Sequence, residues 1–272
     1  MKDDLILNYN IDESKTDVIY NPAIISKVSE KNSYKKSHEI IYVGRLENQK
    51  GLDNLLKIFS MVLTKDDSLI LRIIGEGSLF QKLIDLSISL GINNNVVFEG
   101  YKENIAAYYI QAKATVLTSH FEGMPNTLLE SLYLGTPIIS FDCPSGPSEI
   151  VLHGVNGFLV PFLDNTDFAQ RILETTSENL FDPKEVIETS KKFHIDKIIN
   201  QYERLVVELY PRNCKVCESN RIKNYYFIEP STYNNKIYHY NECLYCGCLY
   251  QIENDTENFS DKSTSLSKTE IN

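Results

Sequence analysis

Two glutamates, Glu122 and Glu130, stand eight positions apart around a Gly-Met-Pro-Asn stretch and the apolar start of a predicted helix. Pro125 suits the first turn of that helix, because the N–H that proline lacks would be unpaired there anyway. Glu122 is therefore expected in the loop before the helix, and Glu130 about one and a half turns inside it. A carboxylate, free backbone N–H groups and a positive helix end would then lie together. This arrangement suits a hydroxyl-rich ligand that carries a phosphate.

The elements that must position these carboxylates alternate between apolar strands and helical segments from Glu39 onward. The expected strands are 40–43, 69–74, 96–98, 115–117 and 138–141, and the expected helices lie around 52–63, 79–88, 105–110 and 125–134. Such alternation predicts an α/β fold, a Rossmann-like parallel sheet with helices on both faces. Right-handed crossovers would place the loops after the strands at one edge, where ligands bind.

Five further motifs accompany the paired glutamates. They are Tyr20-Asn21-Pro22, the turn 43–51 (VGRLENQKG), Ile74-Gly75-Glu76-Gly77, Phe98-Glu99-Gly100-Tyr101 and the stretch 154–161 (GVNGFLVP). In this order they resemble family-4 (group 1) glycosyltransferases, the retaining enzymes of the GT-B fold, and the likeness covers roughly residues 17–210. One Gly-x-Gly alone would be weak evidence, but several motifs in register make accidental resemblance improbable. The resemblance implies the C-terminal, donor-binding half of a GT-B enzyme.

The resemblance also implies roles for these residues in binding a nucleotide-diphosphate sugar, with UDP as the expected nucleotide. Arg45 and Lys50 would stabilise the leaving diphosphate without a catalytic metal; the alternative is two solvated surface charges. Glu122 would hold the transferred sugar, and Glu130 would accept bonds from the ribose diol; helix-start electrostatics would explain the first carboxylate but not the second. The remaining expected donor contacts are Gly44, Gly75, Tyr101, Gly123, Met124, Pro125 and Asn126.

Some of these positions have a competing structural explanation. Gly75 could admit a ligand or could form a tight turn, and Tyr101 could stack on the nucleobase or could pack ordinarily. A side chain at Gly123 would obstruct the ligand. His120 is expected at the surface or in a hydrogen bond rather than in catalysis.

Charge and composition exclude several classes of protein. The net charge of −10 argues against a nucleic-acid partner, because no basic stripe is present to neutralise phosphates. No apolar run is long enough for a membrane helix, and the acidic start does not resemble a secretory signal. We therefore expect a cytoplasmic protein, with peripheral contact at the inner face of the membrane left open.

Four cysteines in two C-x2-C pairs, Cys214/Cys217 and Cys243/Cys246, match a structural zinc site and resemble the zinc ribbon ahead of some methyltransferase domains. Reduced thiols unrelated to metal, or disulfides, are the alternatives, and Cys248 is a possible substitute ligand. Cys143 is expected to be a free buried thiol. The predicted organisation is a linker and inter-lobe remnant at 1–38, a donor domain at 39–211, a zinc ribbon at 212–250 and a disordered tail at 251–272.

The functional prediction is a retaining glycosyltransferase donor lobe that serves transfer to a glycan or lipid-linked acceptor in surface polysaccharide or glycoconjugate assembly. The acceptor lobe of the family has no counterpart in this sequence, so a fragment, a truncated product and a separate chain supplying that lobe all stay open. The alternative from another class is a non-catalytic module that binds nucleotide-sugar or docks a partner through the zinc ribbon.

Overall fold

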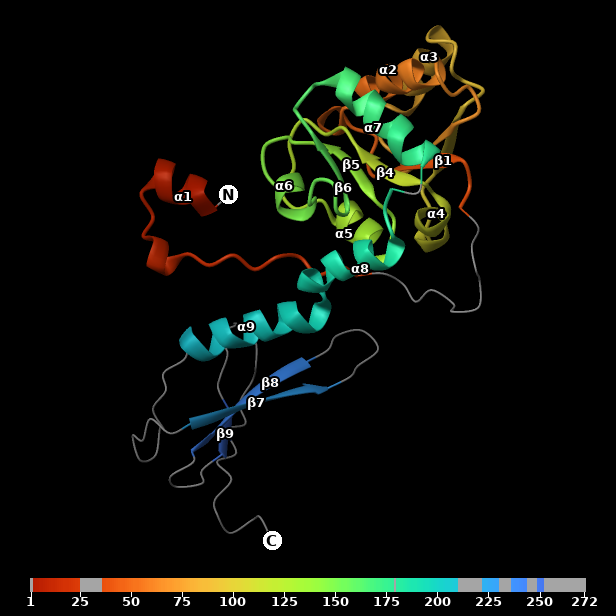
Figure 1. Ribbon diagram of the computed structural model, residues 1–272. Helices are drawn as coiled ribbons and strands as arrows, with labels where there is room; N and C mark the ends of the chain where they lie inside the picture. The colour runs from red at the N-terminus through yellow and green to blue at the C-terminus, as the bar shows by residue number, and fades with distance from the viewer. Residues whose placement is uncertain are drawn as a thin grey trace. The chain divides into compact units, whose positions relative to one another are not determined.

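The computed structural model describes residues 2–24, 36–178, 180–209, 222–229, 236–243 and 249–251 (Figure 1). The chain forms two compact units, Met1–Ile199 and Asn200–Asn272. The division falls within a helix, α9 (Ile195–Leu209), whereas the domain boundary predicted at 211/212 lies outside the described residues.

The first unit is built on a six-stranded parallel sheet with the strand order β3-β2-β1-β4-β5-β6. Its strands are β1 (Glu39–Val43), β2 (Ile70–Ile74), β3 (Val96–Gly100), β4 (Ala114–Leu117), β5 (Ile138–Phe141) and β6 (Gly157–Val160). Every residue of β4 and β5 is buried, as expected of central parallel strands covered on both faces. The predicted Rossmann-like sheet is confirmed.

Helices cover both faces of this sheet (Figure 1). One face carries α2 (Leu52–Leu63), α3 (Phe80–Ser89) and α7 (Asn165–Ser177), and the other carries α4 (Ala106–Gln111), α5 (Asn126–Tyr133) and α8 (Pro183–Ser190). The apolar residues of α2 recur at helical spacing and are buried, Leu52, Leu55, Phe59 and Val62 among them. The other helical elements are α1 (Lys2–Tyr9), α6 (Pro147–Ile150) and the 3-10 turns η1 (Glu13–Lys15), η2 (Asn48–Lys50) and η3 (Lys191–Phe193).

The structure differs from the sequence-based expectation in three elements. Strand β6 was not expected, because the glycines of 154–157 read as a loop; a Cβ at Gly157 would lie 2.0 Å from the carbonyl oxygen of Ile138, so this glycine allows the close approach of two strands. The apolar pattern of 173–210 predicts two or three further helices, but helix α7 already begins at Asn165. Asp164 caps it by accepting a bond from the Asp167 N–H. Helix α1 lies in a segment that the sequence pattern left unassigned.

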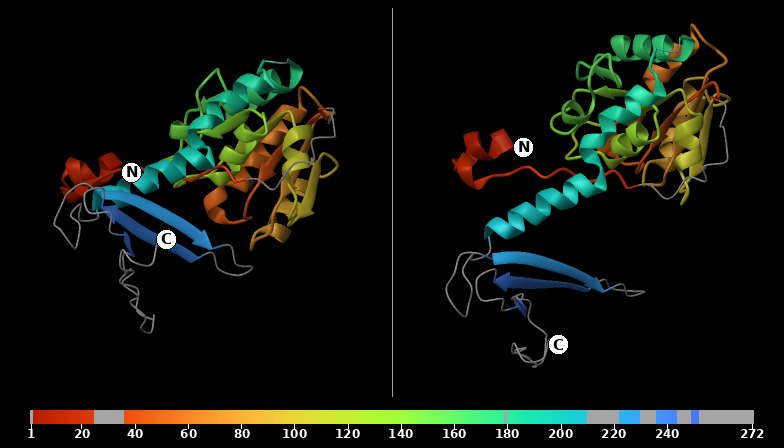
Figure 2. Two further views of the ribbon diagram at one scale, coloured as in Figure 1. Left: turned by 90° about the horizontal axis from the view of Figure 1, so that it is seen from below. Right: turned by 60° about the horizontal axis from the view of Figure 1, so that its bottom comes forward.

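The second unit contains a three-stranded antiparallel sheet in the order β7-β8-β9. The strands are β7 (Ile222–Glu229), β8 (Lys236–Cys243) and β9 (Leu249–Gln251), and Figure 2 shows β7 and β8 running in opposite directions. Ile222 at the start of β7 pairs with Cys243 at the end of β8.

Candidate functional site

The candidate site lies where the strand order of the sheet reverses. Strand β1 is followed along the chain by β2 on one side, while β4 lies on its other side and is followed by β5 and β6. At such a switch point the loops leaving the two neighbouring strands diverge and open a crevice that binds ligands in doubly wound sheets. The turn after β1 holds Arg45 and Lys50, and the loop after β4 holds Glu122, so the fold brings the predicted residues to one place.

A buried ion pair joins the two segments. Lys50 Nζ lies 2.6 Å from Glu122 Oε1, and the hydroxyl of Ser119 donates to the same oxygen at 2.6 Å. The side chains of Lys50 and Glu122 are only 15% and 6% exposed, so the pair is largely shielded from water. Both bonds go to Oε1, which leaves the second carboxylate oxygen of Glu122 available to accept a ligand hydroxyl. The ammonium likewise has donors left for an anion.

Backbone and side-chain hydrogen bonds between the turn and the loop hold this pair in place. The His120 N–H donates to the Gln49 carbonyl at 2.8 Å, and the Gln49 side-chain amide donates to the Phe121 carbonyl at 2.9 Å. The hydroxyl of Thr118 donates to the Gly51 carbonyl at 3.1 Å. These bonds hold the turn after β1 and the loop after β4 in one position relative to each other, as preorganised stabilisation of charge requires.

Glu130 lies on α5, five residues after the N-cap Pro125. The buried hydroxyl of Tyr109 donates to its Oε2 at 2.9 Å. Partial burial raises the pKa of the Glu130 carboxyl above its usual range, and the bond from Tyr109 opposes part of that rise. A carboxylate in this setting is a strong acceptor for a diol, provided that it is ionised.

The raised pKa gives a testable pH dependence. We expect the preference for UDP over 2′,3′-dideoxy-UDP to weaken as the pH falls through the Glu130 pKa, because a protonated carboxyl loses acceptor capacity. The phosphates of the two nucleotides titrate alike, so the ratio of their dissociation constants isolates Glu130. Calorimetric titrations across the mildly acidic range measure it. A ratio that does not change with pH would contradict this assignment, and Glu130→Gln should give a flat profile.

The start of α5 presents backbone donors. Pro125 is the N-cap residue with an extended backbone, so the helix begins at Asn126, one residue later than predicted. Its cap has no side-chain bond, and no acceptor among the described residues takes the N–H of Asn126 or Thr127. The side-chain amide of Asn21 donates to Asn126 Oδ1 at 3.0 Å, which ties the Tyr20-Asn21-Pro22 motif to this helix start. The arrangement is suited to an anion.

Gly123 precedes this helix start and faces open space: a Cβ built on it would meet no atom of the described residues within 4 Å. We therefore expect Gly123→Ala to leave the melting temperature unchanged and to weaken nucleotide-sugar binding about tenfold or more, the cost of a misplaced ligand. Thermal melting and calorimetric titration measure the two effects. Unchanged affinity would mean that no ligand approaches this backbone.

The other predicted residues occupy the same edge of the sheet with fewer contacts. Arg45 is exposed and forms no ion pair with any described residue, so its guanidinium is free for a ligand. Met124 is half-buried against the core. Tyr101 follows β3 and is 70% exposed, which argues against ordinary packing as its role. A Cβ at Gly75 would lie 1.9 Å from the Gly44 carbonyl oxygen, so the close packing of two turns explains this glycine without a ligand.

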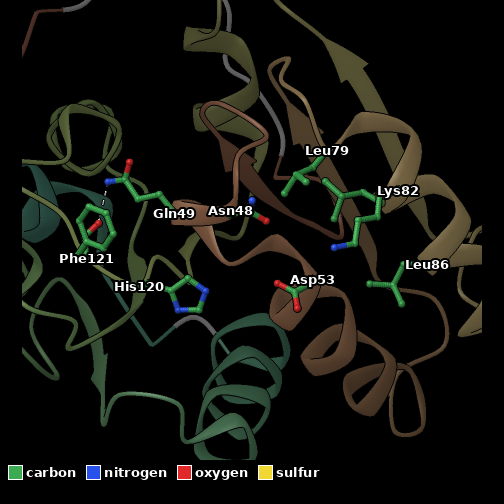
Figure 3. A pocket seen from close by; sticks show the side chains of 9 residues that line it. Asn48, Gln49, Asp53, Leu79, Lys82, Leu86, His120 and Phe121 are labelled. Atoms are coloured by element: carbon green, nitrogen blue, oxygen red, sulfur yellow. Dashed lines mark hydrogen bonds between the residues drawn. The ribbon is translucent and has the colours of Figure 1, made fainter.

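A pocket of about 350 Å³ opens between the turn after β1, the loop after β4 and α3 (Figure 3). None of the predicted site residues lines this pocket, but residues next to them in sequence do. Gln49, His120 and Phe121 form one wall, and Asp53 and Lys82 lie across the opening. The apolar lining is supplied by Leu83 and Leu86 of α3 and by Leu79, the N-cap residue of that helix. The predicted donor residues and this pocket thus lie on adjoining parts of one edge. His120 is exposed, and its ring packs edge-on against Phe162.

The zinc prediction falls largely outside the described residues. Cys214, Cys217 and Cys246 are not described, and Cys243 is described only as the last residue of β8. Elsewhere in the described chain, no group of three or more His, Cys, Asp or Glu side chains could hold a metal ion. Cys143 is a free buried thiol as predicted, and burial raises its pKa to about 11. Within the described ranges, no helix has both the length and the apolar character needed to cross a bilayer.

Comparison with known proteins agrees with this geometry. The chain is 31% identical over 220 residues to the lipopolysaccharide 1,6-galactosyltransferase of Escherichia coli, covering 76% of this chain and 59% of that protein. The solved apo structure of the lipopolysaccharide outer core galactosyltransferase WaaB superposes with a TM-score of 0.65 at 28% identity, covering 77% of this chain and 60% of that one. HepE of Anabaena in complex with UDP, at 21% identity and a TM-score of 0.58, shares the fold over 64% of this chain and 50% of its own.

Fold and site together define a Rossmann-like domain of the GT-B glycosyltransferase class. Residues 25–193 match the family described as "Glycosyl transferases group 1", and the chain belongs to this family. The chain spans less than two thirds of the length of the curated relatives it matches.

Two residues at the site had no role in the sequence-based prediction. Ser119 stands three positions before Glu122, and its hydroxyl within the same motif was a signal that could have been used. Tyr109 contacts Glu130 from another helix, 21 positions earlier in the chain, and no local pattern indicates it.

Proposed function

We propose that this chain binds a nucleotide-diphosphate sugar at the switch point of its first unit. The observation that carries the proposal is the shielded Lys50–Glu122 pair, 2.6 Å long, next to the open start of α5. Lys50 and Arg45 bind the diphosphate, Glu122 accepts hydroxyls of the sugar, and Glu130 accepts those of the ribose. Gly44, Gly123, Met124 and Asn126 bring backbone groups to the ligand, and Tyr101 lies beside the base.

The proposed nucleotide is UDP, which is supported by the UDP-bound neighbour of the same fold. In the transfer, the bond between the anomeric carbon and the diphosphate oxygen breaks, and the oxygen of the acceptor hydroxyl forms a bond to the same carbon. Lys50 and Arg45 stabilise the charge that develops on the diphosphate. Two cations and a helix start supply this stabilisation without a catalytic metal. The family resemblance favours retention at the anomeric carbon, with the leaving phosphate taking the proton of the acceptor hydroxyl.

The proposed acceptor is a glycan or lipid-linked glycan of a surface polysaccharide, handled at the cytoplasmic face of the membrane. The names of the relatives support this class, since the Escherichia coli protein acts on lipopolysaccharide. An acceptor-binding lobe, in the same protein or on a partner chain, would complete the site. The competing function is binding of nucleotide-sugar without transfer.

Calorimetric titration with UDP-, GDP- and ADP-sugars, with released nucleotide assayed in the same samples, tests the proposal. Binding that is tightest for one UDP-sugar, with nucleotide release, supports the transferase. Binding without release favours the module that binds but does not transfer. Absence of binding to all three would refute the donor site.

A structural zinc site in the second unit is a separate proposal. The register of the antiparallel sheet supports it, because Ile222 at the start of β7 lies opposite Cys243 at the end of β8. Cys217 precedes Ile222 by five positions, and Cys246 lies in sequence between β8 and β9. Each C-x2-C pair therefore stands, in sequence, next to a residue of the pair Ile222 and Cys243, as expected of a four-thiolate site.

We expect purified protein to carry one zinc ion per chain, measured by elemental analysis, and Cys214→Ser with Cys217→Ser to lose it. Chelation should expose the amides of 222–251 to hydrogen exchange and leave the parallel sheet protected. Cys143→Ser serves as the control and should retain the metal. Full zinc content in the double variant would overturn the proposal.

A further inference from the structure

We infer that Tyr109 is a positioning residue that sets the Glu130 carboxylate for a ribose diol. The inference rests on the proposed ribose role of Glu130. The contact that points to it joins two helices: the Tyr109 hydroxyl of α4 donates to Glu130 Oε2 of α5 at 2.9 Å. No further hydrogen-bond partner of this hydroxyl is present among the described residues.

A glutamate needs such a contact if it is to bind a diol in one orientation. The last torsion of a glutamate side chain is broad and roughly two-fold, so an untethered carboxylate rotates freely. The bond from Tyr109 fixes the plane of the Glu130 carboxylate and uses one lone pair of Oε2. The whole of Oε1 and the second lone pair of Oε2 are then left for two ribose hydroxyls.

Tyr109 is itself held firmly. Its side chain is fully buried and packs in a small cluster with Ile41 and Ala112. Its carbonyl accepts a hydrogen bond from the Thr136 hydroxyl at 2.6 Å. A buried tyrosine hydroxyl needs a hydrogen-bond partner, and here that partner is the Glu130 carboxylate. Because the ring of Tyr109 is fixed by packing, the hydrogen bond also fixes the orientation of Glu130.

The same hydrogen bond favours the ionised form of Glu130. Burial raises the pKa of this carboxyl, and the donor from Tyr109 lowers it again in part. Loss of the hydroxyl would therefore affect both the orientation and the charge of the group that accepts the ribose. Both effects act on nucleotides that carry ribose hydroxyls and spare nucleotides that lack them.

Tyr109→Phe tests the inference, with Tyr108→Phe as the matched control. Tyr108 is the neighbouring residue, half-buried, and its hydroxyl lies 3.4 Å from Glu99 Oε2, away from Glu130. We expect Tyr109→Phe to weaken UDP binding about fivefold, the value of one hydrogen bond, and to change 2′,3′-dideoxy-UDP binding by less than about twofold. Tyr108→Phe should leave both affinities unchanged.

Equal losses for the two nucleotides would overturn the inference, because they would mean that Tyr109 supports the fold alone. No loss for either would overturn it as well. Glu130→Gln shows whether the positioning role of Tyr109 or the ribose role of Glu130 is at fault. If Glu130→Gln keeps the preference for UDP over 2′,3′-dideoxy-UDP, the ribose role itself is wrong. Should Tyr109→Phe fold poorly, Thr136→Val is the second variant, because it keeps the Tyr109 hydroxyl. It loses the bond that Thr136 donates to the Tyr109 carbonyl and the bond that it accepts from Lys36 Nζ at 3.3 Å, and it should give a smaller loss confined to UDP.

Discussion

Lys50→Met is expected to weaken binding of a UDP-sugar about 10- to 100-fold and to lower the melting temperature. The loss of affinity corresponds to a charge-assisted hydrogen bond to phosphate, worth roughly 1.5–3 kcal/mol. The loss of stability arises because Glu122 would stay buried with Ser119 as the one side-chain partner left among the residues that the structure describes. Removing one member of a buried pair typically costs about 3 kcal/mol or more. Calorimetric titration and thermal melting measure the two quantities.

Lys57→Met is the matched control for this substitution. Lys57 forms an exposed pair with Asp53 at 3.5 Å, one turn along α2, and such pairs contribute little. We expect that variant to bind and melt like the wild type. If Lys50→Met bound UDP-sugar with unchanged affinity, Lys50 would be a structural partner of Glu122 and no ligand of the diphosphate.

Glu122→Gln should have the opposite effect on the nucleotide. The variant removes the negative charge that lies 2.6 Å from Lys50, so the ammonium is free to bind the diphosphate and the affinity for UDP alone should rise by up to about tenfold. The advantage of UDP-sugar over UDP should fall about fivefold, because a neutral amide holds sugar hydroxyls less strongly than a carboxylate.

Titrations with UDP and UDP-sugar, carried out on the wild type and on both variants, separate these effects. Opposite changes in UDP affinity for Lys50→Met and Glu122→Gln are expected. If both variants lost UDP binding, the substitutions would have disrupted the contact between η2 and the loop after β4. That result would contradict separate roles for Lys50 and Glu122. Ser119→Ala, which removes the second donor to Glu122 Oε1, should show a weaker form of the loss of stability expected for Lys50→Met.

The strands and the edge at which the site lies could be predicted from the sequence, because central parallel strands such as β5 are mostly apolar runs between turn residues. The crossover rules then place the loops at one edge. Strand β6 escaped prediction because the glycine that permits its close pairing at Gly157 also reads as a turn signal. Local pattern carries no information on such a long-range contact.

The pairing inside the site could not be predicted for the same reason. Arg45, Lys50 and Glu122 were each assigned a ligand, but the direct bond between Lys50 and Glu122 joins residues 72 positions apart. It depends on the reversal of strand order between β1 and β4, which a single sequence does not specify. The Tyr109–Glu130 contact likewise depends on how α4 and α5 pack on one face of the sheet.

Hydrogen exchange measured with and without the nucleotide sugar that binds most tightly would test most directly where the ligand lies. We expect protection of the amides in 44–51 and 118–130, the turn after β1 and the loop and helix start after β4, and no change in 222–251. A result in which neither of these segments is protected, or in which only the antiparallel sheet is protected, would contradict a donor site at the switch point.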